Sequence, residues 1–202
     1  MIGRTSLICL GKVALLTGAL ITGATYGYLE NTEVPTETCE IITLSQGKVN
    51  QLEVNWIRKY NPSLSEGDAT ALYRHIERTI QRYHNDPSYQ KGVTKQVTPR
   101  LFLSLILRES GFKWSAISDH GAIGLCQVMP LHLEDLEKAG IGTDLLDAEN
   151  NIEAGVHILM GYARGVNSIT RALSRYNGGY KREKAGRGYA RAVLKLYEEM
   201  EG

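Results

Sequence analysis

Apolar residues recur every three or four positions along much of this chain from residue 48 onward, and this spacing is typical of amphipathic helices. The spacing predicts helices over residues 48–60, 65–84, 99–109, 151–162, 168–176 and 189–200. The 99–109 segment is apolar on nearly every side, so we expect that helix to be buried and central. Because no stretch shows a convincing strand alternation, the chain is predicted to be mostly α-helical.

Two of the predicted helices have clear start signals. Ser65 is followed by Glu66 and Asp68, which combine a capping hydroxyl with acids that the positive end of the helix dipole favours. Thr98 precedes Pro99, and proline is well suited to the first position of a helix.

The first 28 residues have the features of a targeting or anchoring segment. Arg4 and Lys12 precede an apolar run, and Glu30 and Glu33 follow it, a charge order that predicts a cytoplasmic N-terminus and an exported remainder. Residues 7–29 are long enough to anchor in a membrane. A cleavable signal peptide and a buried helix of a cytoplasmic protein are the alternatives. We expect three regions: a signal peptide or signal anchor at 1–28, a linker with a short helix at 29–63, and a folded domain at 64–202.

The composition is that of an ordinary globular protein, with 43% hydrophobic and 22% charged residues in a chain of 202. The formal net charge of +1 does not favour nucleic acid as a partner. Charge is unevenly distributed, because Arg164–Lys195 is rich in Lys and Arg whereas Glu134–Glu153 is rich in acids. Two solvated faces would explain this pattern, and so would a basic flank beside a site for an anionic polymer.

The three cysteines, Cys9, Cys39 and Cys126, have neither a metal-ligand spacing nor the pattern of a disulfide framework. We therefore predict no metal site, and no cofactor. A Cys39–Cys126 bridge is one alternative for an exported domain. We favour two free thiols, because Cys126 lies between apolar residues and has the character of a small core residue.

Glu109 is the first candidate for catalytic chemistry. It follows Leu105, Ile106 and Leu107 at the C-terminal end of the predicted buried helix. Apolar surroundings and the negative end of the helix dipole both disfavour a carboxylate, so both should raise the pKa of Glu109. A raised pKa suits a general acid that works near neutral pH. The alternative is an ordinary surface Glu paired with Arg108 or with a Lys.

A glycine-bounded turn and a second polar block follow Glu109. Gly121 and Gly124 allow the backbone to approach a ligand closely, and Gln127 offers a donor and an acceptor suited to hydroxyl and acetamido groups. Tyr176 and Asn177 add a phenol and a second amide at the end of a predicted helix. Aromatic rings beside amides are typical of sugar-binding sites, although Tyr176 would equally suit the core.

The motifs around Glu109, Gln127 and Tyr176, taken in their order along the chain, resemble the soluble-lytic-transglycosylase-like (SLT) domain. This family belongs to the lysozyme-like superfamily and is similar in fold to goose-type lysozyme. The resemblance covers about Leu64–Met200, and the blocks that carry it are Glu109–Phe112, Ser118–Pro130, Asn151–Gly155, Ala172–Gly179 and Tyr189. It implies a mostly α, lysozyme-like (α+β superfamily) single catalytic domain after the N-terminal hydrophobic segment.

The resemblance also implies an activity, namely cleavage of the β-1,4 bond between N-acetylmuramic acid and N-acetylglucosamine in peptidoglycan. Family members release 1,6-anhydromuramyl ends by intramolecular transfer, with one Glu acting first as acid and then as base, and Glu109 matches that Glu. No second acid stands in an obvious motif beside it, unlike the usual pair of carboxylates in a glycosidase. The positions that match substrate-binding residues of the family are Ser118, Gln127, Tyr176, Asn177 and Tyr189.

Two alternatives remain open beside this interpretation. One is a hydrolytic, lysozyme-like muramidase in which Asp119 or Asp147 orients water, and the other is a non-catalytic peptidoglycan-binding assembly protein. The sequence departs from the family at Cys126, where Met is usual, and at Ala185 and Gly186, where Glu-Thr is frequent. The second departure concerns contacts at the far side of the groove and not the acid.

The resemblance and the N-terminal segment together predict where the domain works. We expect it on the periplasmic side of the inner membrane, exported, or associated with a virion if the chain comes from a phage. The expected partners are peptidoglycan glycan strands, the membrane through residues 7–29, and a secretion, conjugation or phage assembly machinery.

Overall fold

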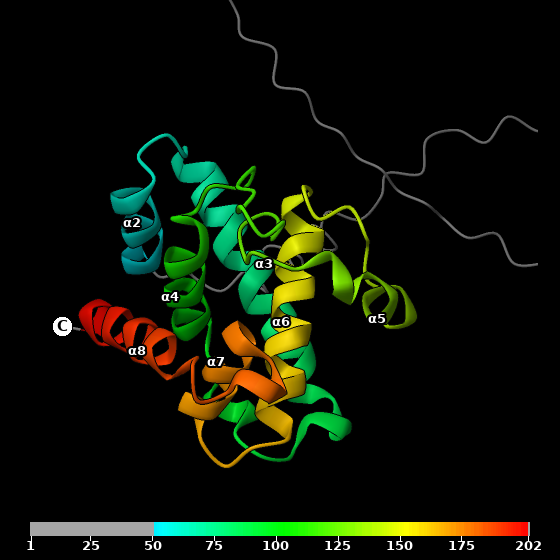
Figure 1. The fold of residues 1–202 in the computed structure, drawn as a ribbon. Coiled ribbons are helices and arrows are strands. Elements are labelled where there is room, and N and C mark those ends of the chain that lie inside the picture. The colour runs from blue at the N-terminus through cyan, green and yellow to red at the C-terminus, as the bar shows by residue number, and fades with distance from the viewer. Residues whose placement is uncertain (1–50, 202) are drawn as a thin grey trace, which may run out of the picture. The chain divides into compact units, whose positions relative to one another are not determined.

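The structure is a computed structural model that describes residues 51–201 (Figure 1). The α-helices of this part are α2 (Gln51–Tyr60), α3 (Glu66–Asn85), α4 (Pro99–Ser110), α5 (Leu133–Lys138), α6 (Ala148–Arg164), α7 (Ile169–Gly178) and α8 (Arg187–Glu201). Short 3-10 helices join them at Pro87–Tyr89, Thr94–Gln96, Pro130–His132 and Tyr180–Arg182. Within the described residues, β pairing is limited to isolated bridges of Ile123 with Ile117 and with Val128. The prediction of a mostly helical domain is confirmed.

Several predictions fall outside the described residues. They concern the segment 1–28 with its membrane-spanning stretch 7–29, the linker as far as residue 50, and the residues Cys9 and Cys39. Of the helices in residues 51–201, none is long and apolar enough to cross a membrane.

Helix α4 is the central element of the core. Every side chain from Leu101 to Ile106 is buried, so this helix is in contact with protein on all sides, as its apolar sequence predicted. It packs against α3 and α8, and α6 packs against α3 and α7 on the other side of the core (Figure 1). Burial of this continuous apolar surface is the main force that stabilises the domain.

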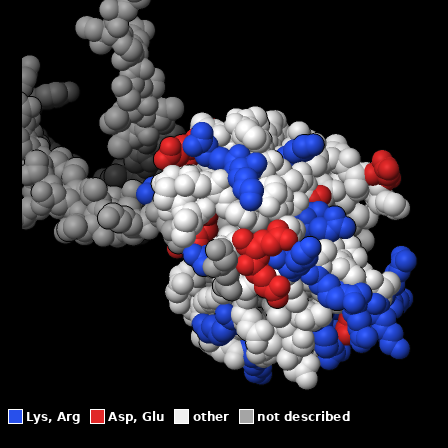
Figure 2. Space-filling model, turned by 90° about the vertical axis from the view of Figure 1, so that its left-hand side faces the viewer, with Lys and Arg blue, Asp and Glu red and all other residues white. Residues whose placement is uncertain are grey.

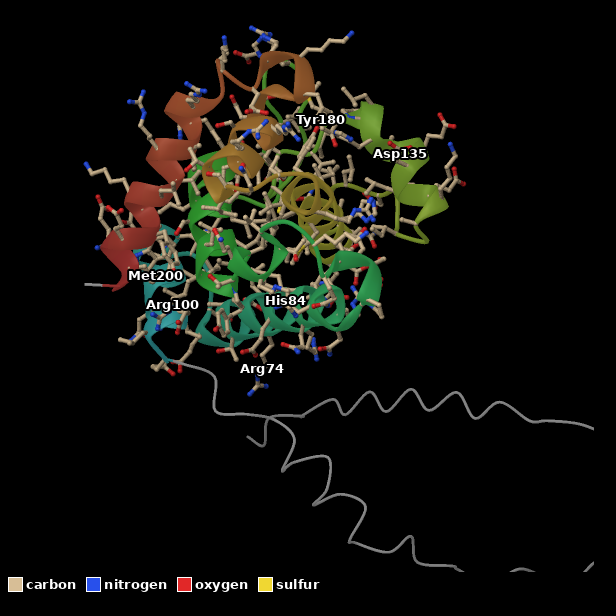
Figure 3. The ribbon with its side chains drawn as sticks, turned by 90° about the horizontal axis from the view of Figure 1, so that it is seen from below. Arg74, His84, Arg100, Asp135, Tyr180 and Met200 are labelled. Atoms are coloured by element: carbon tan, nitrogen blue, oxygen red, sulfur yellow. The ribbon has the colours of Figure 1, made fainter. Side chains whose placement is uncertain are left out.

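Helix α2 belongs to this folded part of the chain. Val54 and Ile57 are fully buried, and the Trp56 ring meets the Phe112 ring edge to face, with 6.0 Å between their centroids. The guanidinium of Arg100, labelled in Figure 3, donates to the buried carboxylate of Glu53 at 2.5 Å, which ties α2 to α4. Helix α2 therefore supplies core surface on which α3 and α4 pack.

The helix starts at Ser65 and Thr98 are confirmed by their capping bonds. Ser65 Oγ accepts from the Asp68 N–H at 3.0 Å, and Thr98 Oγ1 accepts from the Leu101 N–H at 3.2 Å. The start of α6 was misplaced by three residues. Asp147 caps it by accepting the Asn150 N–H at 2.8 Å, so residues 148–150 belong to the first turn of the helix.

Candidate active site

Glu109 lies in the last turn of α4, at the end of a rigid and buried rod. Gly111 ends the helix with a left-handed backbone (φ 60°), and its N–H donates to the Leu107 carbonyl, which is the usual reason for glycine at this position. The chain then turns into Phe112, which is fully buried although its φ is also positive, 62°. Asn61 Nδ2 donates to the Phe112 carbonyl at 2.9 Å and holds this turn in place.

The carboxyl group of Glu109 has a pKa close to neutral pH. Burial raises its pKa from 4.5 to about 7, against smaller lowering effects of a hydrogen bond from Tyr189 and of the charge of Arg108. The Tyr189 hydroxyl donates to Glu109 Oε1 at 2.6 Å. Among the residues that the structure describes, the hydrogen-bond partner of the Glu109 carboxyl group is thus a phenol and not a Lys or Arg. The surface ion pair that we considered as the alternative is therefore wrong.

Tyr189 reaches Glu109 from α8, which packs against both α4 and α7. Burial and the neighbouring charge of Glu109 raise the pKa of Tyr189 well above its usual value. The phenol therefore stays protonated and acts as a fixed donor to the carboxylate. Such a bond both orients the carboxyl group and favours its ionised form.

Replacing Tyr189 by Phe should raise the pKa of Glu109 above 7 by about one unit, because a hydrogen bond to a charged group is lost. Titration of the Glu109 carboxyl carbon by NMR measures this shift. Tyr176→Phe is the matched control, because the Tyr176 hydroxyl donates elsewhere, and its Glu109 midpoint should stay near 7. A midpoint that falls or stays constant in Tyr189→Phe would contradict the role assigned to this bond.

The loop from Ser118 to Pro130 forms the neighbouring part of the site. The Ser118 N–H donates to the Ala122 carbonyl at 2.9 Å, and the Ser118 hydroxyl accepts the Ala122 N–H at 3.0 Å. Gln127 has a positive φ of 49°, and its amide nitrogen donates to the carbonyls of Ala116 (3.2 Å) and Gly124 (3.0 Å). Both side chains thus stabilise the loop.

Asn151 holds this loop to α6, a role that the sequence alone did not suggest. Its buried amide accepts from the Cys126 N–H at 2.8 Å and donates to the carbonyls of Ile123 and Leu145, both at 2.9 Å. A Cβ on Gly124 would lie 2.3 Å from the Asn151 amide nitrogen. The glycine that we expected to admit a ligand therefore admits Asn151 instead, whereas a Cβ on Gly121 would meet nothing within 4 Å.

Cys126 and Tyr176 connect the loop with the Glu109 side of the site. Cys126 is fully buried, which confirms the prediction that it is a core residue. Its thiol is free. The Tyr176 hydroxyl donates to the Cys126 carbonyl at 2.8 Å. Burial raises the pKa of Tyr176, and the charges of Cys126 and Glu109 add to this effect, so α7, the loop and α4 meet here.

The remaining predicted residues lie at the surface. Asn177 is exposed at the end of α7. The two acids considered for a water-activating role do not act on Glu109: Asp119 is exposed and Asp147 caps α6, and neither is among the groups that shift the Glu109 pKa. In the described part of the chain, no group of three or more His, Cys, Asp and Glu side chains is arranged to hold a metal ion.

Comparison with known families agrees with this geometry. The chain matches the model of the transglycosylase SLT domain over residues 86–196, which is more than half of its 202 residues. The match runs from the connection after α3 into α8. It therefore includes Glu109, its hydrogen-bond partner Tyr189, and the Ser118–Pro130 loop that Asn151 holds to α6. The members of this family cleave peptidoglycan in the manner of lytic transglycosylases. On the match over residues 86–196, this chain belongs to the SLT transglycosylase domain family.

Proposed function

We propose that this protein cleaves the β-1,4 bond between N-acetylmuramic acid and N-acetylglucosamine by intramolecular transfer, with Glu109 as the only acid and base. The observation that carries the proposal is a single carboxyl group with a pKa of about 7. A phenol holds it, and among residues 51–201 no second carboxylate contributes to its pKa shift. A pKa near the working pH allows one group to give and take a proton in turn.

In the first step, protonated Glu109 donates its proton to the glycosidic oxygen as the C1–O4 bond breaks. In the second step, the resulting carboxylate accepts the proton of the C6 hydroxyl as O6 of the same muramic sugar bonds to C1. No water is consumed, and Glu109 ends protonated as it began. The Tyr189 hydroxyl, 2.6 Å from Oε1, stabilises the carboxylate between the two steps and leaves Oε2 to face the substrate.

The other polar groups around Glu109 suit a glycan strand. We assign the Gln127 carbonyl and the Ser118 hydroxyl to sugar hydroxyl or acetamido donors, and the exposed Asn177 amide to an acetamido group. The Tyr176 hydroxyl is already held by the Cys126 carbonyl, so we assign its ring, and not its hydroxyl, to contact with the strand. Because peptidoglycan lies outside the cytoplasmic membrane, this activity agrees with the export predicted from the charges around residues 7–29.

The test is the chemistry of the soluble products released from purified sacculi by the full-length chain. Intramolecular transfer predicts 1,6-anhydromuramyl ends that contain no solvent oxygen, so products formed in oxygen-18-labelled water should stay unlabelled when analysed by mass spectrometry. Reducible muramic ends that carry the heavy oxygen would establish hydrolysis and overturn the proposal. Sacculi incubated with Glu109→Gln protein are the control for background release.

A further inference from the structure

A cluster of basic side chains adjoins the proposed site. It lies on residues 180–187, which we call the basic loop and which connect α7 with the first residue of α8. The exposed basic residues of this loop are Lys181, Arg182, Lys184 and Arg187. Arg191 and Lys195 continue the cluster along the exposed face of α8. In Figure 2 the basic side chains gather over the lower right of the visible face, where few acidic side chains are seen.

The one acid of the basic loop, Glu183, is already neutralised. Its carboxylate accepts from Arg171 Nε at 2.8 Å and from Arg175 Nε at 2.6 Å, both on α7, and these bonds lower its pKa to about 2. Arg175 also lies over the Tyr180 ring, 4.8 Å from its centroid. Glu183 therefore fixes the loop to α7, and no ion pair with a described residue neutralises Lys181, Arg182 or Lys184.

The loop is held rigidly beside the proposed substrate contacts. It begins three residues after Asn177 and ends two residues before Tyr189, so it joins two of the positions proposed to contact the substrate. Gly186 packs so closely on α7 that a Cβ there would lie 2.1 Å from the Ser174 carbonyl oxygen. Tyr180 is 65% exposed and, with Asp135, lines a shallow surface pocket; both residues are labelled in Figure 3. A charged and preorganised surface thus adjoins the glycan path.

We infer that the basic loop binds the carboxylates of the peptides attached to the glycan, so that the substrate is the peptide-substituted strand rather than the bare polysaccharide. This inference rests on the proposed function. The repeating sugars of the strand offer hydroxyl and acetamido groups, whereas the negative charge lies on the peptides borne by each muramic sugar. Lys and Arg side chains beside the site therefore match the peptide and not the sugar, and the exposed Tyr180 ring offers an apolar contact to it.

The experiment compares two substrates and three proteins. Glycan strands are released from sacculi with their peptides uncross-linked, and half of the preparation is stripped of peptides by an amidase that cuts at the lactyl group. The lactyl carboxylates that this cut exposes are then capped as methyl amides, so that the stripped strands carry no charge in place of the peptides. The full-length wild type, Lys181→Gln/Arg182→Gln/Lys184→Gln, and the matched control Lys59→Gln/Arg78→Gln/Lys91→Gln are assayed for anhydromuramyl release from each. The control removes the same exposed charge from α2, α3 and the connection after α3.

The wild type and the control should prefer peptide-bearing strands, and the preference should fall as salt is raised. The basic-loop variant should lose about fivefold in kcat/KM on peptide-bearing strands and almost nothing on stripped strands, because each exposed charge contact contributes modestly. Equal losses on both substrates, or no loss on either, would overturn the inference, as would binding of the loop to anionic phospholipid vesicles in place of strands. If the proposed function itself is wrong, the result differs from all of these, because the wild type would then release no anhydromuramyl product from either substrate.

Discussion

Glu109→Gln should lower the rate of anhydromuramyl release by about 10²- to 10⁴-fold, the range that one general acid–base group contributes. The amide has nearly the same shape as the carboxyl group but can neither donate the proton that the leaving oxygen needs nor accept the one from the C6 hydroxyl. Because both steps depend on the same side chain, no other ionisable group in the described site takes over. The Gln carbonyl still accepts the Tyr189 hydroxyl, so the fold and the binding of sacculi should remain.

The rate is measured by quantifying anhydro-muropeptides released from sacculi, and binding by co-sedimentation of protein with sacculi. Glu137→Gln is the matched control, since Glu137 is exposed on α5, and it should behave as the wild type does. Activity of Glu109→Gln within a few fold of the wild type would refute the assignment of the acid. Loss of binding together with loss of activity would indicate a folding defect instead.

The same substitution should make the folded protein more stable above pH 7. Burial raises the pKa of Glu109 from 4.5 to about 7, so between these values the folded state binds more protons than the unfolded state. The free energy of unfolding therefore falls as pH rises through this window. Full ionisation of Glu109 lowers the free energy of unfolding by at most about 3 kcal/mol. The uncharged Gln does not ionise, so the variant keeps this stability.

Chemical denaturation of the wild type and of Glu109→Gln at several pH values measures the difference. The two free energies of unfolding should agree near pH 4, diverge between pH 4.5 and 7, and differ by up to about 3 kcal/mol at pH 8. Glu137→Gln should follow the wild type throughout. A wild type that gains stability relative to Glu109→Gln as pH rises would contradict the raised pKa.

Most of the fold could be predicted from periodicity and caps. The helix over 99–109 was found because it is apolar on nearly every side, and Ser65 and Thr98 marked helix starts correctly. Helix α5 was missed because it is six residues long and only Leu136 is buried, which is too little to make a pattern. Helix α2 was found, but its membership of the core was not, since a contact such as Trp56 with Phe112 leaves no local signal.

Part of the candidate site could likewise be predicted from the sequence, and part could not. An acid at the end of an apolar helix is visible in sequence, because the residues that bury Glu109 precede it directly in the chain. The Tyr189 hydroxyl donates to it across 80 positions, and Asn151 acts on a loop 25 to 28 positions away. The Asn151 block was singled out by its place in the family pattern, but the hydrogen bonds by which Asn151 holds the loop to α6 could not be predicted.

The sequence by itself determined the helical class and the family, because these depend on neighbours along the chain and on ordered motifs, and it singled out Glu109 as the candidate acid. Only the tertiary structure decided that Gly124 makes room for Asn151 and not for a ligand, and that Glu183 is neutralised by Arg171 and Arg175. It also decided that Glu109 bonds a phenol and not a cation. Hydrogen bonds and close packing require groups within a few ångströms, and that proximity arises only when distant segments are folded together.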